Sequence, residues 1–335
     1  MFALVASVAF APPNRADAQG PSANWKVVAN IRDSKQTTEK WAWFADEISK
    51  RTNGRLTLQV STFPELGLTG TEFIRLLSIG LIDAGELVTG YVSGEVPLVE
   101  GVQMMGVYDS LAQAQKAYAA WTKRVILPNA KKVGGKPVAS FAFANMYLWS
   151  KFPVNSLEDL KRKKIRIFST AQANYLKALG AEPVSIPLAE VYPALERGVV
   201  DAVITGPDVA NRTKLYEIVG YVTDLMFGPG AGWVVISDQT WSSLSPDLRS
   251  AVEGLLPELQ QRGWELAFQE NEENLKAVMA HGVKATIPVK PEWRDKLQEI
   301  ARKVVIPAWA SRAGPDGVAA FNEAIAPIVG VTATK

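Results

Sequence analysis

Two stretches of this sequence spell nearly the same helix-to-strand turn. Residues 80–90 read GLIDAGELVTG and residues 198–206 read GVVDAVITG. Each begins with a glycine, which is typical of a helix C-terminus. Each continues with two aliphatic residues, Asp, Ala and a mainly apolar run, which indicates a buried strand. The repeat predicts two α/β lobes of similar plan, although two unrelated helix-to-strand turns would read the same way.

The segment before the first copy alternates strands and helices. We expect a strand over 25–29, an amphipathic helix over 37–51, a half-buried strand over 56–60 and a helix over 71–79. The strand of the first copy then completes a β-α-β-α-β order. This order is typical of a parallel sheet.

The second copy ends a similar series. Its expected elements are a strand over 165–167, a helix capped by Ser169 or Thr170, a strand over 183–186, a helix over 189–197 and the strand of the second copy. Pro193 lies inside the second of these helices and must kink it or begin its second part.

After residue 227 the pattern changes. The glycines of GPGAG, residues 228–232, have no strand before them and no helix after them, so a phosphate-binding loop is a weak interpretation. We expect a flexible crossing into the strand WVVIS instead. Helices complete the chain: a long one from Ser245-Pro246 to about His281, bent at Pro257, another over 291–312, and a short one within 314–330.

Composition narrows the function classes. A chain of 335 residues suggests about two domains, and a net charge of +2 gives no general attraction to nucleic acid or anionic membranes. There is no cysteine and a single histidine, His281, which excludes thiolate nucleophiles and three-histidine metal sites. No motif places a nucleophile beside a base. We expect no enzyme, cofactor or metal, although lysine or carboxylate chemistry stays open.

The N-terminus predicts export. Residues 2–11 form an apolar run of signal-peptide length, and Ala-Asp-Ala at 16–18 fits a cleavage site. The run is too short to span a bilayer. No basic segment precedes it, and a disordered apolar tail is the alternative. We expect a signal peptide over 1–18 and a periplasmic chain that begins near Gln19.

Several motifs resemble the DctP-type substrate-binding proteins of tripartite ATP-independent periplasmic (TRAP) transporters. They are GRLTLQVSTFPELG (54–67), SKFPVNSLEDLK (150–161), KIRIFS (164–169) and KALGAEPVSIPLAEVYPALERGVVDA (177–202). The motifs occur in the family's order and the similarity covers nearly the whole mature chain. The last string is long and specific.

This resemblance implies a two-lobed periplasmic-binding-protein-like fold with a ligand cleft between the lobes and a long bent bracing helix. The expected parts are lobe I over 19–140, lobe II over 141–227, a strand over 228–245 that returns to lobe I, and the bent helix with C-terminal helices over 246–335. The family captures a small organic acid and delivers it to the small and large permease subunits. A sensory role is the alternative, and ligand identity and a monomeric or dimeric state stay open.

Arg166 is the strongest candidate for ligand binding. It lies between two apolar strand residues, where an unpaired charge is costly. A guanidinium matches a carboxylate with two parallel hydrogen bonds. In the family, the arginine of this strand motif clamps the ligand carboxylate, and Arg166 matches it. The alternative is a structural arginine paired with a neighbouring acid.

Matching to the family gives further candidates and two departures. Asn145 stands where many relatives carry a second arginine, and Thr205 lies in ITGP where many have a Gln-Glu-Asn-Pro run. Arg32 is a second cation in the loop after the first strand, unless it is simply exposed. Tyr91, Phe168 and Trp233 are expected to face the cleft, where they stack on a ring or form its wall. Ser169, beside Phe168, completes the expected site.

Overall fold

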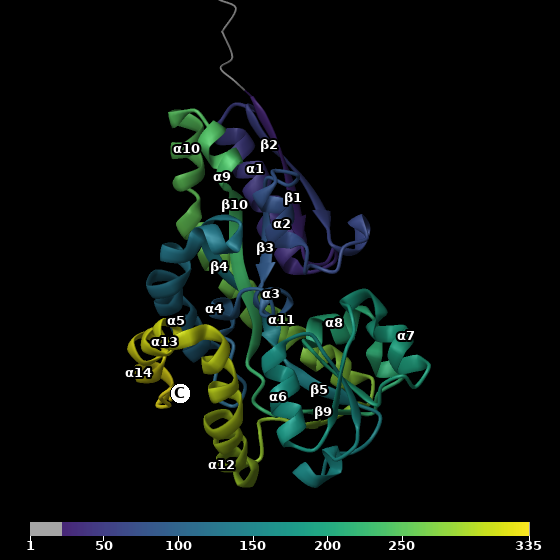
Figure 1. Ribbon diagram of the computed structural model, residues 1–335. Helices are drawn as coiled ribbons and strands as arrows, with labels where there is room; N and C mark the ends of the chain where they lie inside the picture. The colour runs from purple at the N-terminus through teal and green to yellow at the C-terminus, as the bar shows by residue number, and fades with distance from the viewer. Residues whose placement is uncertain (1–21, 335) are drawn as a thin grey trace, which may run out of the picture.

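Two β-sheets organise the residues that the structure describes, 22–334 (Figure 1). The structure is a computed structural model. The strand order β2-β1-β3-β10-β4 defines lobe I, and the order β11-β9-β5-β8-β6-β7 defines lobe II. These two sheets confirm the predicted α/β class. The expected signal peptide over 1–18 lies outside the described residues.

Lobe I begins with the predicted parallel strands. Strand β1 pairs in parallel with both β2 and β3, and β10 then joins β3 to β4 with antiparallel pairing on both sides. The bounds are β1 (Ala23–Ala29), β2 (Leu56–Thr62), β3 (Ala84–Val88), β4 (Gly135–Asn145) and β10 (Pro229–Ser237). Strand β4 is not anticipated by the sequence analysis.

Lobe II has the same parallel centre. Strand β6 pairs in parallel with β7 and β8, whereas β5 pairs antiparallel with β8 and β9. The bounds are β5 (Tyr147–Ser150), β6 (Lys164–Ile167), β7 (Glu182–Ser185), β8 (Ala202–Thr205), β9 (Tyr221–Thr223) and β11 (Lys284–Thr286).

Short helices cover the lobe I sheet. Segments labelled η are 3-10 or π helices, and those labelled α are α-helices. The helix expected over 37–51 is η1 continued by α1, and it buries Phe44 and Ile48 as its spacing predicts. The bounds are η1 (Gln36–Trp41), α1 (Ala42–Arg51), η2 (Pro64–Leu66), α2 (Phe73–Ser78), α3 (Thr89–Val92), α4 (Pro97–Glu100), α5 (Leu111–Trp121), η3 (Thr122–Ile126) and η4 (Leu127–Val133).

The lobe II helices follow the strands as expected. Ser169 caps the first of them, because its side chain accepts a hydrogen bond from the Gln172 N–H at 3.2 Å. Pro193 lies near the start of a helix, so it begins a segment rather than kinking one. The bounds are η5 (Leu157–Leu160), α6 (Thr170–Ala178), η6 (Leu188–Glu190), α7 (Val191–Glu196), α8 (Pro207–Arg212) and η7 (Leu215–Glu217).

The chain changes sheets at Met146, a few residues beyond the boundary expected at 141. It returns through β10, whose first residue pairs with Asn145. Gly230 and Gly232 of GPGAG lie inside β10 and Gly228 directly precedes it, so the strand begins earlier than expected and the expected flexible crossing over 228–232 is wrong. A Cβ on Gly232 would lie 1.9 Å from the Leu87 carbonyl oxygen. These glycines therefore allow close strand packing.

The expected long bent helix is present as α10 (Pro246–Glu253) and α11 (Leu256–Ala280). The break falls at Gly254 and Leu255, whereas Pro257 lies in the first turn of α11, where no intrahelical N–H bond is lost. Helix α11 packs on β4 of lobe I and on α8 of lobe II, so it braces both lobes. None of the helices within 22–334 is both long and apolar enough to cross a membrane.

The C-terminal helices also contact both lobes. Segment η8 packs on α6 of lobe II, while α13 packs on α4 and α5 of lobe I. The helical backbone is interrupted at Gly314, where φ is 75°, close to the helix end expected at 312, and a second helical stretch then runs to Ala324 as expected. The bounds are α9 (Asp238–Ser243), α12 (Pro291–Ile300), η8 (Ala301–Val305), α13 (Ile306–Ala324) and α14 (Ala326–Val329).

Candidate functional site

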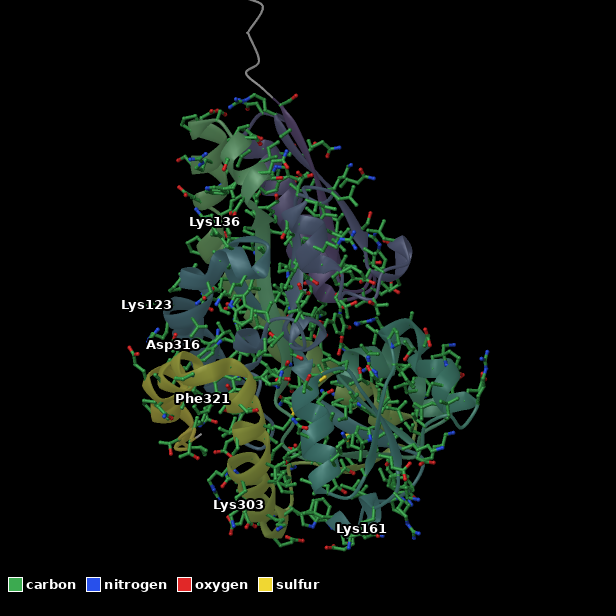
Figure 2. All side chains as sticks on the ribbon, viewed as in Figure 1. Lys123, Lys136, Lys161, Lys303, Asp316 and Phe321 are labelled. Atoms are coloured by element: carbon green, nitrogen blue, oxygen red, sulfur yellow. The ribbon has the colours of Figure 1, made fainter. Side chains whose placement is uncertain are left out.

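A cleft opens where the two lobes meet. Its inner part is a cavity of about 30 Å³, which residues of both sheets line. Its outer part has a volume of about 440 Å³, which is in the usual range for small-molecule sites. Tyr91 of lobe I and Arg166 and Phe168 of lobe II line both parts. Basic side chains such as Lys161 and Lys303 lie on the outer surface instead (Figure 2).

Arg166 is held inside lobe II by backbone carbonyls. It lies on β6 between β7 and β8 and is 1% exposed. Its Nε donates to the Ile186 carbonyl at 2.9 Å, and its Nη1 donates to the Ile204 carbonyl at 2.9 Å. Its Nη2 is buried and has no partner among the residues that the structure describes. No described carboxylate pairs with this guanidinium, which counts against a structural ion pair.

The charge of Arg166 is therefore available to an anion. Burial lowers its pKa to about 10, so the group stays protonated at neutral pH. A buried charge that lacks a counter-charge raises the free energy of the folded state until an anion compensates it. The Phe168 ring centre lies 4.9 Å from Cζ and contributes a weak cation–π attraction. Carboxylates and phosphates are the anions that accept strong hydrogen bonds from a guanidinium.

Two aromatic rings meet across the cleft. The rings of Tyr91 and Phe168 lie 5.8 Å apart at an angle of 76°, in an edge-to-face arrangement. The Tyr91 hydroxyl donates to Asn30 Oδ1 at 3.3 Å, and burial raises the pKa of Tyr91. Tyr91 and Phe168 thus lie at the cleft, as the sequence analysis expects. Asn30, at the end of β1, is a lining residue that it missed.

Asp208 is the second buried charge that lines the inner cavity. It lies in the first turn of α8 and is 1% exposed. Its Oδ2 accepts from Arg212 Nη2 at 2.8 Å, whereas its Oδ1 has no partner among the described residues. The sequence analysis missed Asp208. The only signal was its place two residues beyond Gly206, at the turn where a strand gives way to a helix.

Asp208 belongs to a charge network that reaches lobe I. Arg212 Nη1 also donates to Glu270 Oε1 on α11 at 3.2 Å, and the Lys35 backbone N–H donates to the same oxygen at 3.0 Å. Burial, followed by the charge of Asp208, raises the pKa of Glu270 to about 7. The network therefore joins α8, the bracing helix and the loop before η1.

Thr205 and Ser169 lie at the cleft as expected. Thr205 lines the inner cavity, and its backbone carbonyl accepts from Trp149 Nε1 at 3.0 Å. Ser169 lines the outer part while its hydroxyl caps α6.

Three expected residues do not line either part of the cleft: Asn145, Arg32 and Trp233. Asn145 has its backbone N–H bonded to Asn271 Oδ1 at 3.1 Å, and the neighbouring Met146 lines the cavity instead. Arg32 pairs with Glu65 at 2.6 Å with its side chain 46% exposed, which matches the exposed-loop alternative.

Trp233 is the clearest correction. It is fully buried in lobe I, where its Nε1 donates to Thr122 Oγ1 at 2.7 Å and its ring centre lies 5.3 Å from that of Tyr118. Gly230 of the same strand lines the cavity. Because strand residues alternate between faces, Trp233 points to the opposite side. The expectation that it faces the cleft is wrong.

The described part of the chain holds no group of three or more His, Asp or Glu residues arranged to hold a metal ion. The cleft instead combines one unpaired guanidinium, one half-used carboxylate and several apolar or aromatic walls. Such an arrangement suits reversible binding of a small polar molecule.

Comparisons with known proteins agree with this geometry. Residues 28–307 match the family described as bacterial extracellular solute-binding protein, family 7. A solute-binding protein of Roseobacter denitrificans is 26% identical over 212 residues, which span 62% of this chain and 64% of the relative. The C4-dicarboxylate-binding periplasmic protein DctP of Rhodobacter capsulatus is 27% identical over 296 residues, or 85% of this chain and 86% of the relative.

A solved structure shares the fold. The extracytoplasmic solute receptor DctP7 of Bordetella pertussis, which binds pyroglutamic acid, superposes with a TM-score of 0.83 at 25% identity. The match covers 90% of this chain and 99% of that receptor. This chain therefore belongs to the bacterial extracellular solute-binding proteins of family 7, the DctP family of TRAP transporter receptors.

Proposed function

We propose that this protein captures a small organic acid in the cleft and delivers it, chemically unchanged, to a TRAP permease from the periplasm. The observation that carries this proposal is the free Nη2 of Arg166, a buried charged donor without an acceptor. Relatives that bind C4-dicarboxylates and pyroglutamic acid support an acidic ligand.

The proposed cycle is capture and closure. A carboxylate enters from the outer part of the cleft and accepts from Arg166 Nη2, while Tyr91 and Phe168 close over its body. Water leaves the cavity, and this strengthens the charged hydrogen bond. Ligand affinity then includes the free-energy difference between the open and closed arrangements.

Thermal unfolding against a panel of acids tests this proposal. The panel holds pyroglutamate, aliphatic monoacids, keto acids, aromatic acids, sugar acids and dicarboxylates. A ligand at about 100 times its Kd stabilises by about 2.7 kcal/mol, which raises Tm by roughly 5–10 °C. A response to acids and none to their amides supports the proposal.

Arg166→Met should remove the response without unfolding the protein. A charged hydrogen bond contributes about 1.5–3 kcal/mol, so we expect affinity to fall by about one to two orders of magnitude. Arg197→Met is the matched control, because Arg197 is exposed in the same lobe. Equal affinity of Arg166→Met and the wild type in calorimetry would refute the assignment.

A further inference from the structure

We propose that Glu100 is a positioning residue that holds the cleft closed without touching the ligand. It lies on α4 of lobe I and lines neither part of the cleft. Through one hydrogen bond to α6 it fixes the turn of lobe II that carries Phe168, and so raises the affinity for every acid by the same factor. This inference rests on the proposed function, because it describes the closed arrangement in which the acid is held.

The carboxylate of Glu100 joins the two lobes directly. It is fully buried, and its Oε1 accepts from the Ala171 N–H at 2.8 Å. Ala171 lies in the first turn of α6, where backbone N–H groups have no partner within the helix. A negative charge at this end of a helix is also stabilised by the helix dipole. Glu100 therefore satisfies a donor of lobe II that the helix itself leaves free.

Arg312 compensates the charge of Glu100 from the side of lobe I. It lies on α13, which packs on α4, and it donates to the second oxygen of Glu100. Its Nη1 also donates to the Ser93 carbonyl at 3.1 Å, which fixes the guanidinium. When the lobes separate, Glu100 loses the Ala171 N–H but keeps this counter-charge. The bond between the lobes can therefore break without leaving a buried charge unpaired, which would be costly.

Helix α4 holds Glu100 in a fixed place. Trp309 Nε1 donates to the Pro97 carbonyl at 2.8 Å, and Trp121 Nε1 donates to the Leu98 carbonyl at 3.0 Å. Both indole rings are fully buried. Two of the four residues of this short helix are thus tied to the core of lobe I, and the position of the Glu100 carboxylate is set by that lobe.

The turn that contains Ala171 carries a cleft residue. Gln172 Oε1 accepts from the Phe168 N–H at 2.9 Å, and the Gln172 N–H donates to Ser169 Oγ at 3.2 Å. These reciprocal bonds make the turn a single unit. Its first residue, Phe168, lines both parts of the cleft. A bond to Ala171 therefore also fixes the place of the Phe168 ring.

Replacing the ion pair by apolar side chains tests the inference. The double change Glu100→Met and Arg312→Met removes the acceptor for Ala171 and leaves neither charge uncompensated, so the fold should be kept. Calorimetry on the full mature chain with pyroglutamate, lactate, succinate and glucuronate gives the Kd values. For each acid that binds, we expect Kd to rise about tenfold in the double variant, because the closed arrangement is less populated. The single change Glu100→Gln keeps an acceptor but not the charge and should raise Kd about threefold.

Kinetics distinguish a link between the lobes from a general structural role. Stopped-flow tryptophan fluorescence should show faster acid release and an unchanged association rate, because the link forms after the acid has entered. Glu95→Gln is the matched control, since Glu95 is exposed in the segment just before α4. Lower thermal stability with unchanged Kd and release rate would refute the role of Glu100 and leave the proposed function intact. Factors that differ widely between acids would also refute it, because Glu100 contacts none of them.

Distances between the lobes test the inference apart from any ligand. The chain contains no cysteine, so Thr57→Cys and Glu196→Cys place one spin label on an exposed residue of each lobe. In the empty protein, double electron–electron resonance should show a smaller population of the short distance when both methionine changes are present. Identical distance distributions would overturn the inference. If no acid binds the wild type, the proposed function fails, and these distances alone decide whether Glu100 holds the lobes together.

Discussion

Backbone carbonyls, rather than an acid, hold the guanidinium of Arg166. The Ile186 and Ile204 carbonyls orient two of its nitrogens without neutralising its charge. An acidic partner would compete with an incoming carboxylate for the same donors. The Arg166 side chain is thus already ordered before a ligand arrives, and its charge is left for the ligand. Binding then loses less side-chain entropy.

Glu270 gives the protein a pH-dependent stability. Its pKa rises from 4.5 to about 7 through burial and the nearby charge of Asp208, against the opposing effect of Arg212. Between these values the folded state binds more protons than the unfolded chain, so stability falls as pH rises from about 4.5 to about 7. The loss over this range is on the order of 3 kcal/mol.

Urea unfolding at pH 5 and pH 8 measures this effect. Glu270→Gln should be more stable relative to the wild type at pH 8 than at pH 5, because the amide carries no charge to bury. Glu265→Gln, an exposed change on the same helix, is the control. An identical pH dependence in the wild type and Glu270→Gln would contradict the assignment.

At the scale of elements, glycines determine how closely the strands of lobe I approach. The hypothetical Cβ of Gly232 meets the Leu87 carbonyl oxygen, which belongs to the backbone and cannot turn aside as a side chain can. The antiparallel pairing of β10 with β3 therefore depends on this residue.

Gly232→Ala should destabilise the protein by about 1–3 kcal/mol, the usual range for overpacking. Gly220→Ala is the matched control, since a Cβ there has no neighbour within 4 Å and φ is not positive. Thermal unfolding of both variants provides the comparison. Equal stability of the two would show that β3 and β10 do not need the glycine.

The sequence predicts the elements whose signals are local. Helices that end at glycine and strands that alternate or follow such a glycine are found near their expected positions, including β2, α6 and β8. Strands β5, β9 and β11 are short and acquire their pairing from distant segments, so no local pattern marks them.

The residues of the site also divide into those that the sequence locates and those that it misses or misplaces. The family resemblance correctly locates Arg166, Phe168 and Tyr91 at the cleft, although their contact with a ligand stays a prediction. Asp208 and Met146 were missed because lining a cavity depends on how strands from both sheets meet, which sequence periodicity does not encode. Trp233 was misplaced because the face of β10 depends on its register with β3 and β4.

At the scale of the whole molecule, direct contacts join the lobes across the cleft. Glu100 on α4 accepts from the Ala171 N–H at the start of α6 at 2.8 Å, and its other oxygen binds Arg312 of α13. A Cβ on Gly90 of α3 would lie 2.7 Å from the Phe168 ring. The lobes therefore approach closely at α3 and α4.

Gly90→Ala should hinder this approach. We expect the acid affinity to fall about tenfold, because the new methyl group would displace the Phe168 ring and destabilise the closed cleft. Part of the binding free energy would then be used to close the cleft. Calorimetry gives the affinity, and small-angle scattering of the acid-saturated variant should show a larger radius of gyration than the wild type. Unchanged affinity would mean that Phe168 turns aside freely.

The bracing helix has a mechanical consequence. The chain passes between the lobes near Met146, again before Pro229, a third time along α11, which packs on β4 and α8, and a fourth time through η8, which packs on α6, and α13, which packs on α4 and α5. We expect these four links to resist sliding and twisting of one lobe over the other more than bending. We therefore expect loading and unloading to be a hinge rotation that breaks no hydrogen bond of either sheet, so that the sheet amides of the empty protein exchange only as fast as its global unfolding allows.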